Sequence, residues 1–131
     1  MTNIVDILKT DFPTLYSLIA KANLVDTLKN AQALTILAPN DAAFNKIPKE
    51  TLQAVGNSPE QLKAILLQHV IPSKVESTDI VTLTSAKTLG GQITIAVKNG
   101  EVIINNSARV VDADIEADNG VIHEIDTVIL P

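Results

Sequence analysis

The chain has 131 residues, of which 46% are hydrophobic but only 2% aromatic, and 10 Lys and Arg against 15 Asp and Glu give it a net charge of -5. This length fits a single domain over residues 1–131 with a core of aliphatic side chains. The negative charge argues against nucleic acid or an anionic membrane surface as a partner, and the absence of cysteine excludes disulfides, thiolate catalysis and Cys-based metal sites.

The first half of the chain has the apolar spacing of helices. Apolar residues recur at i, i+3, i+4 and i+7 over residues 13–22, and Pro13 is tolerated in the first turn of such a helix. Asn23 is expected to cap a second, shorter helix over residues 24–29. We therefore expect the domain to begin with helices.

A short apolar strand is expected at residues 35–38, and Pro39 ends it. Asn40 is placed to cap a helix over residues 41–46, where Asp41 would meet the positive end of the helix dipole. Another short helix is expected over residues 49–55.

The next helix has the clearest start signal in the chain. Ser58 can cap it, and Pro59 suits its first position. Its apolar face is formed by Leu62, Ile65, Leu66, His69 and Val70. His69 is therefore expected to point toward the core.

In the second half the apolar period changes to two, which predicts an α+β domain. Strands are expected over residues 82–89 and 92–98, followed by a tight turn at Asn99-Gly100, because Asn-Gly readily takes two positive φ angles. A two-residue loop predicts the cross-strand pairs Val97 with Val102 and Ile95 with Ile104.

Both histidines fall on apolar faces, His69 on a helix and His123 on the last strand. We expect neutral, buried imidazoles whose nitrogens bond to the backbone, because burial without partners is costly. Metal ligation or acid–base catalysis is the alternative. Two isolated histidines without cysteine are a weak metal signal.

Carboxylates alternate with apolar residues late in the chain, which predicts an extended segment with one acidic face. They are Asp112, Asp114, Glu116 and Asp118. A calcium loop of the EF-hand type starting at Asp114 fails, since Asn119 and Ile125 stand where Gly and Glu are needed. A solvated face, a recognition surface and a weak carboxylate metal site all remain open.

No sequence motif for catalysis is present. The chain lacks the nucleophile elbow, the phosphate loop and the dinucleotide fingerprint. Paired carboxylates of a glycosidase usually come with stacking aromatics, whereas this chain has only one Tyr and two Phe. We predict a protein without enzymatic activity, cofactor or bound metal.

Two distant segments resemble the motifs of one family. Residues 35–44 read as strand, Pro, cap and helix, and residues 119–131 read as one buried strand. Between them, residues 66–72 are similar to the family's Leu-Leu-x-Tyr-His-Val segment, and residues 85–89 resemble its usual strand entry. On these residues the whole chain resembles the fasciclin domain.

The resemblance implies a wedge of about seven β-strands with several packed α-helices, mainly in the N-terminal half. It also implies that the two end motifs lie together in the core. The residues that match the family motifs, and are expected to be structural, are Thr35, Pro39, Asn40, Phe44, His69, Asn119, Gly120, His123 and Asp126.

By resemblance, the function is that of a cell-adhesion or protein-interaction module, extracellular, at the cell surface or periplasmic, with a protein or matrix partner and favoured as a monomer. The candidate contact residues are Asp112, Asp114, Ile115, Glu116 and Asp118. Asp114-Ile115 stands where the family has an Asp-Ile dipeptide proposed for integrin binding. Gln68 replaces the tyrosine of the other such segment, so that role is not expected around His69.

Location within the cell stays open at this level. The first residues lack the basic and apolar regions of a secretory signal, so a signal was removed or the protein is made without one. No stretch approaches the ~20 apolar residues of a membrane-spanning helix, so direct membrane insertion is not expected. The alternative function is a stand-alone soluble protein of this type that binds a small ligand or a protein partner.

Overall fold

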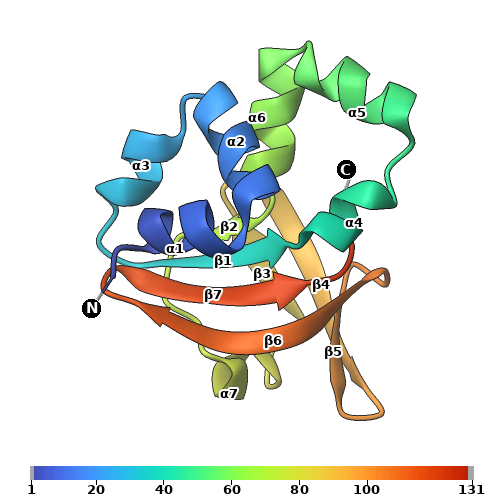
Figure 1. Cartoon of the computed structure of the whole chain (residues 1–131). Helices are drawn as coiled ribbons and strands as arrows, with labels where there is room; N and C mark the ends of the chain where they lie inside the picture. The colour runs from blue at the N-terminus through green and yellow to red at the C-terminus, as the bar shows by residue number, and fades with distance from the viewer. Residues whose placement is uncertain (1, 130–131) are drawn as a thin grey trace.

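The computed structural model of the protein describes residues 2–129. One seven-stranded sheet, in the order β2-β1-β7-β6-β5-β4-β3, carries helices mainly from the first half of the chain (Figure 1), which confirms the expected α+β class. The helices are α1 (Ile4–Asp11), α2 (Pro13–Lys21), α3 (Val25–Lys29), α4 (Asp41–Asn45), α5 (Lys49–Gly56), α6 (Pro59–Leu67) and α7 (Ser77–Ile80). The strands are β1 (Leu34–Pro39), β2 (Val70–Ile71), β3 (Ser85–Thr88), β4 (Gly91–Lys98), β5 (Glu101–Ile104), β6 (Ala108–Ala117) and β7 (Gly120–Ile125). Within residues 2–129, no helix combines the length and the apolar character that crossing a membrane requires.

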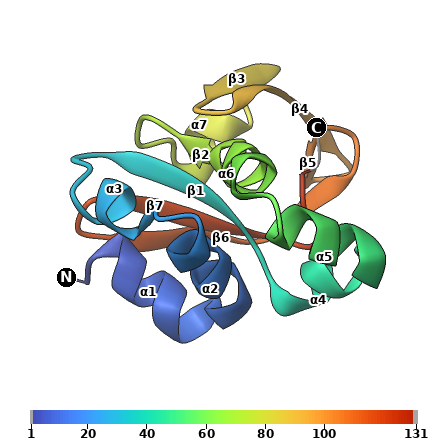
Figure 2. The same ribbon diagram turned by 90° about the horizontal axis from the view of Figure 1, so that it is seen from above.

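The sheet has a hydrophobic core on each side. Figure 1 shows α1 to α6 above β1, β7 and β6, with α7 below them, and Figure 2 shows α1 to α3 gathered over these strands. The upper core contains Ile36 and Ile122 with helix residues, and the lower core contains Leu37 and Ile125 with residues of β2, β4, β5 and α7. Strand β1 is therefore buried along its whole length, which explains its unbroken apolar sequence.

Strands β1 and β7 bring the two end motifs together. They pair in parallel, from Leu34 opposite Gly120 to Pro39 opposite Ile125. A side chain at position 120 would place its Cβ only 2.2 Å from the Leu34 carbonyl oxygen, so only glycine fits this approach. The expected contact between the two motifs is confirmed.

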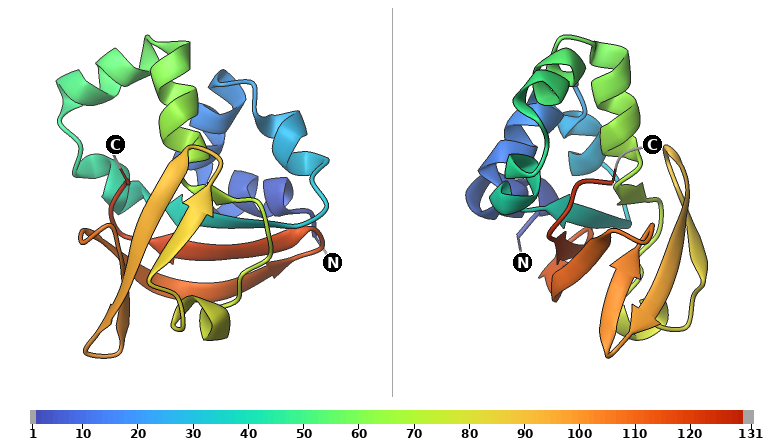
Figure 3. Two further views of the ribbon diagram at one scale, coloured as in Figure 1. Left: turned by 180° about the vertical axis from the view of Figure 1, so that it is seen from behind. Right: turned by 90° about the vertical axis from the view of Figure 1, so that its right-hand side faces the viewer.

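The β4–β5 hairpin has the predicted turn and register. Asn99 and Gly100 have φ angles of 55° and 80°, as a tight hairpin of this type requires. The cross-strand pairs include Val97 with Val102 and Ile95 with Ile104. In Figure 3 the hairpin extends away from β6, which gives the sheet its wedge shape.

Two local predictions were wrong. Asn23 does not cap α3; it has a φ angle of 61° and turns the chain, and Leu24 occupies the N-cap position without a side-chain bond. The strand expected over 82–89 begins only at Ser85, because the preceding residues form α7 and its exit turn. The sequence carried no strong cap for that short helix.

The last strand is shorter than predicted. Strand β7 ends at Ile125, after which the Asp126 N–H donates to the Arg109 carbonyl oxygen and the chain leaves the sheet. Ile129 then donates its N–H to His69 beside α6. Residues 130–131 of the predicted strand lie outside the described residues.

Candidate functional site

His69 lies between α6 and β2 and is only 2% exposed. Its Nδ1 lies 2.8 Å from the Ile65 carbonyl oxygen, and its Nε2 accepts a hydrogen bond of 2.9 Å from the Ile129 N–H. Nδ1 must therefore carry the proton and donate to Ile65. Burial lowers the pKa of His69 to about 4, against the opposing effect of the Ile65 carbonyl. His69 is therefore a neutral imidazole at pH 7, with both ring nitrogens bonded to backbone.

His123, on β7, is fully buried between the sheet and the loop before α7. Its Nδ1 accepts a bond of 3.1 Å from the Asp114 N–H, and its Nε2 lies 2.8 Å from the Val75 carbonyl oxygen, to which it donates. Both histidines are thus buried and bonded to backbone, as their spacing predicted. Neither ring has a nitrogen left for a metal or a substrate.

Asn119 connects three segments at the start of β7. Its Oδ1 accepts a bond of 2.9 Å from the Ile4 N–H at the first turn of α1. Its Nδ2 donates to the carbonyl oxygens of Leu28 and Ala31, at 3.0 and 3.2 Å. These bonds satisfy backbone groups at the ends of α1 and α3 that the helices leave unpaired.

The motif residues of β1 also bond to backbone. The Thr35 hydroxyl donates to the Ser73 carbonyl oxygen at 2.6 Å and accepts from the Val75 N–H at 2.7 Å. Asn40 caps α4, as predicted, through a bond of 2.9 Å from the Ala43 N–H to its Oδ1. Its Nδ2 donates to a Glu124 carboxylate oxygen at 2.9 Å, which ties this cap to β7.

Asp126 joins the end of β7 to β6. One carboxylate oxygen accepts from the Arg109 N–H at 2.9 Å, and the other lies 3.4 Å from the Arg109 guanidinium. Partial burial acts to raise its pKa, but the Arg109 N–H and the Thr127 hydroxyl outweigh it, so the pKa of Asp126 lies below its usual value. Across the described residues, every buried side-chain nitrogen or oxygen has a hydrogen-bond partner.

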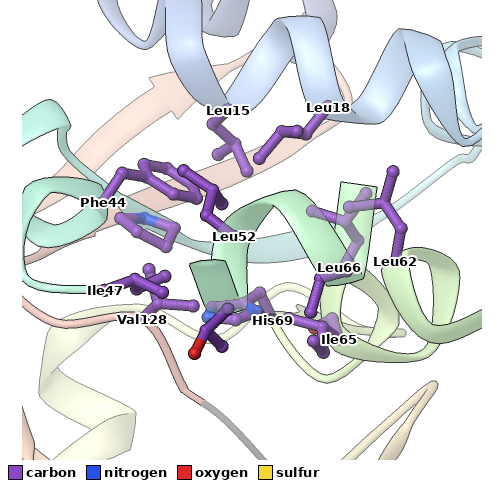
Figure 4. Close-up of a pocket in the computed structure, with 13 residues that line it drawn as sticks. Leu15, Leu18, Phe44, Ile47, Leu52, Leu62, Ile65, Leu66, His69 and Val128 are labelled. Carbon is purple, nitrogen blue, oxygen red and sulfur yellow. Dashed lines mark hydrogen bonds between the residues drawn. The ribbon is translucent and has the colours of Figure 1, made fainter. Parts of the chain in front are cut away.

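An apolar cavity of about 20 Å³ lies among α2, α4, α5 and α6 (Figure 4). Leu15, Phe44, Leu52 and Leu66 point into it, and His69 lies at its base. A void of this size holds about one water molecule, whereas ligand pockets usually measure several hundred Å³. Helical spacing placed Leu15 and Leu66 on apolar helix faces, and the family resemblance gave Phe44 a structural role. Leu52 and the void itself were not predicted.

The acidic segment, Asp112 to Asp118, differs from the prediction of a single acidic face. Register shifts in the β6–β7 pairing place Asp112 opposite Glu124 but Glu116 opposite Val121. Paired residues share a face and neighbouring residues alternate, so Asp112 and Glu116 lie on opposite faces of the sheet. Ile115 pairs with Ile122 and packs against the upper core. Asp118 lies in the turn after β6 and donates its N–H to Thr2.

Three carboxylates gather on the lower face, where Asp114 and Glu116 meet Glu76 from the loop before α7. Their oxygens lie within 4.8 Å of one another. Lys74 balances them, with its Nζ 3.0 Å from Glu116 and 3.5 Å from Glu76. Ser77 donates its N–H and its hydroxyl to the Asp114 carboxylate. These contacts hold the cluster together; sequence spacing missed Glu76 and Lys74, which are distant along the chain.

The pKa shifts in this cluster follow from the same contacts. The Ser77 hydroxyl and N–H lower the pKa of Asp114, and the hydrogen bond from Lys74 lowers the pKa of Glu116. Burial raises the pKa of Glu76, and the neighbouring Glu116 and Asp114 carboxylates add to this effect. The electrostatic field of the cluster is therefore acidic but partly neutralised.

A groove of about 370 Å³ lies beside this cluster. Its walls are α7 and the turn of the β4–β5 hairpin, and β6 lies between them. The lining residues are Ser77, Thr78, Val81, Gly100, Glu101, Val102, Val110 and Ala113. The groove arises where β5 and β6 separate, so no local sequence pattern could have shown it.

Comparison with known families matches residues 10–131 to the Fasciclin domain. The chain belongs to the fasciclin family. An uncharacterized protein from Synechocystis is 40% identical over 132 residues, covering 99% of this chain and 98% of that protein. Transforming growth factor-beta-induced protein ig-h3 from Sus scrofa is 36% identical over 92% of this chain, but the match spans only 18% of that protein.

The fold also matches a solved structure of this family. The structure is a FAS1 domain pair from the insect cell adhesion molecule Fasciclin I, with a TM-score of 0.72, 20% identity, and coverage of 92% of this chain and 45% of that one. This fasciclin domain thus shares its wedge of strands and its packed helices with the solved pair. The paired motifs on β1 and β7 lie at the centre of that wedge.

Proposed function

We propose that this fasciclin domain is a non-enzymatic protein-interaction module of the adhesion type, acting outside the cytoplasm on a cell-surface or matrix protein. Membership of the family supports this, as does the fold shared with a protein named as an insect cell adhesion molecule. Both histidines bond to backbone groups through their ring nitrogens, and the buried polar motif residues bond within the fold, which supports a structural role for them. A fold alone does not fix a function, so the contact surface has to be identified from the exposed residues.

The observation that carries this function is the exposure of the acidic segment. Asp112, Asp114, Glu116 and Asp118 are all exposed, whereas the neighbouring β7 is almost entirely buried. Ile115 is half-buried under the helices and supports the segment from within. Clustered charges on a rigid strand favour a partner of opposite charge and accelerate its association.

Affinity capture from surface and soluble fractions tests this function. The bait is the wild-type domain beside a variant that neutralises three carboxylates, Asp112→Asn/Glu116→Gln/Asp118→Asn. The matched control, Asp26→Asn/Glu50→Gln/Glu60→Gln, changes the net charge equally at exposed positions of α3, α5 and α6. We expect a surface partner that binds the wild type and the control but not the first variant. A partner that all three baits retain equally would move the contact surface elsewhere.

A second candidate is a stand-alone protein of this family that binds a small ligand or a protein partner inside the cell or the periplasm. The Synechocystis relative, which this chain matches over nearly its whole length, supports a protein made of this domain alone. Fractionation of the source cells distinguishes the two candidates. Recovery of the protein in the cytosol alone would favour the second and exclude an adhesion role.

A further inference from the structure

Strand β6 is paired on one side only over most of its length. Strand β5 pairs with it at Ala108 and Arg109, whereas β7 pairs with it from Val110 to Ala117. Among the described residues, no strand pairs with residues 110–117 on the side away from β7. Alternate residues of an antiparallel strand direct their N–H and C=O groups to each side. The register shifts between Val110 and Ile115 interrupt this alternation, and the backbone groups that do not pair with β7 are the donors and acceptors that this edge offers. Figure 1 shows the edge running between α7 and the β4–β5 hairpin.

The open edge borders the groove. Val110 and Ala113 of β6 contribute to the lining of the groove together with Val81 and Val102. Val81 in the lining is 49% exposed, and Val97, the cross-strand partner of the lining residue Val102, is 47% exposed. A peptide that adds as a strand to a sheet edge uses both features. Hydrogen bonds to the unpaired backbone give it affinity, and contacts of its side chains with an apolar groove give it specificity.

The charges around the edge define the occupant. Residues 109–118 carry one cation, Arg109, against four carboxylates, and Glu101 lies in the groove wall. Arg109 is already paired with Glu101 and Asp126, and Lys74 with Glu116 and Glu76, which leaves Asp112, Asp114 and Asp118 without a cationic partner among the ion pairs of the described residues. The edge therefore presents excess negative charge, which attracts a basic segment and repels an acidic one.

We infer that the open edge of β6 binds an extended, basic peptide segment of a partner protein as an added strand, with apolar side chains of that segment in the groove between α7 and the hairpin turn. This inference rests on the proposed function and specifies how its partner binds. A second copy of this chain is a poor occupant, because pairing two β6 edges would bring carboxylates against carboxylates between molecules that each carry a net charge of -5.

A designed peptide tests the strand addition independently of any natural partner. The probe is a peptide of alternating Lys and Val, compared with one in which alternate residues are N-methylated and with one in which Glu replaces Lys. Binding is followed by amide chemical shifts of the labelled domain. We expect the first peptide to bind with its largest shifts at 110–117, and the N-methylated peptide to bind roughly tenfold more weakly, because it lacks the strand-pairing donors.

A substitution in the groove provides a second test of the inference. Val81→Lys places a charge in the groove wall and should weaken the Lys-Val peptide at least about tenfold. Leu89→Lys is the matched control, since Leu89 is 45% exposed and does not line the groove; it should leave binding unchanged. Circular dichroism verifies that both variants are folded.

Several outcomes overturn the inference. They are no binding at about 1 mM peptide, equal binding of the N-methylated peptide, equal binding of the Glu peptide, and a wild-type dimer that Val81→Lys dissociates. The affinity capture described above tests the proposed function separately from strand addition. A captured partner that depends on the acidic segment but tolerates Val81→Lys would keep the function and reject strand addition.

Discussion

His69 joins the end of α6 to the segment after β7 through hydrogen bonds at both ring nitrogens. Because Nε2 must accept from Ile129, protonation there would break that bond and place a charge in the core. Burial of the ring penalises its charged form and lowers the pKa of His69 to about 4. An unfolded chain would protonate the same ring near pH 6.5.

This linkage predicts an acid-sensitive fold. Between pH 7 and pH 5 the unfolded state binds more protons at His69 than the folded state, so the free energy of unfolding should fall by about 2 kcal/mol. Asp114 and Asp126 have lowered pKa values and contribute only below their ordinary values, at more acidic pH. Urea unfolding at both pH values measures the change.

The His69→Gln variant provides the control for this effect. It should be less stable at pH 7, since it cannot reproduce both backbone bonds, but its stability should vary much less between pH 7 and pH 5. An equal decrease in both proteins would mean that the acid sensitivity comes from another group.

Asn119 offers a sharper test of a single polar side chain. Asn119→Ala leaves the Ile4 N–H and the carbonyl oxygens of Leu28 and Ala31 without their partner, and should lower the free energy of unfolding by about 2 to 4 kcal/mol. Asn30→Ala is the matched control at an exposed helix end. Thermal unfolding compares the two. Similar losses of stability in the two variants would show that the hydrogen bonds of Asn119 contribute little.

Elements of this fold differ in how far local sequence explains them. Helix α6 begins at the predicted Ser58 cap, and the hairpin turn follows from Asn-Gly, because both depend on neighbouring residues. Helix α7 and the turn at Asn23 were missed because they depend on the segments against which they pack. The parallel pairing of β1 with β7 joins residues that are far apart, and Gly120 sets its spacing.

Gly120→Ala should be strongly destabilising because the new methyl group would collide with the Leu34 carbonyl oxygen on the neighbouring strand. We expect a loss of at least about 2 kcal/mol in the free energy of unfolding. Gly56→Ala, at the end of α5, is the control: its methyl would meet only the flexible Lys21 ammonium, and a stability gain of up to about 1 kcal/mol is expected. Chemical denaturation measures both, and equal stabilities would disprove a tight β1–β7 approach.

At the scale of the whole molecule, the sheet is covered in its middle and open at β6. Helices bury one side of β1 and β7, while the hairpin, β2 and α7 bury the other. Strand β6 retains an open edge with bulges and carboxylates, features that keep strand edges from pairing with one another. The carboxylates also attract a partner of opposite charge.

Removing that protection should cause self-association. We expect the wild type to sediment as a monomer and the Asp112→Thr/Glu116→Thr variant to form concentration-dependent dimers or larger species, because β-branched residues favour strand pairing once the repulsion is gone. Asp26→Asn/Glu60→Gln reduces the charge equally on the helices and should remain monomeric. If the control variant also self-associates, the association results from the lower net charge and not from the edge of β6.

The sequence by itself determined the α+β order, the hairpin register, the caps at Asn40 and Ser58, and the burial of both histidines. These follow from apolar periodicity and turn chemistry, which act between near neighbours. Only the tertiary structure decided that Asp112 and Glu116 face opposite sides, that Glu76 and Lys74 join Asp114, and that a groove lies along β6. A bulge shifts register through pairing with another strand, and a groove exists only where distant elements separate, so neither is encoded in the local pattern.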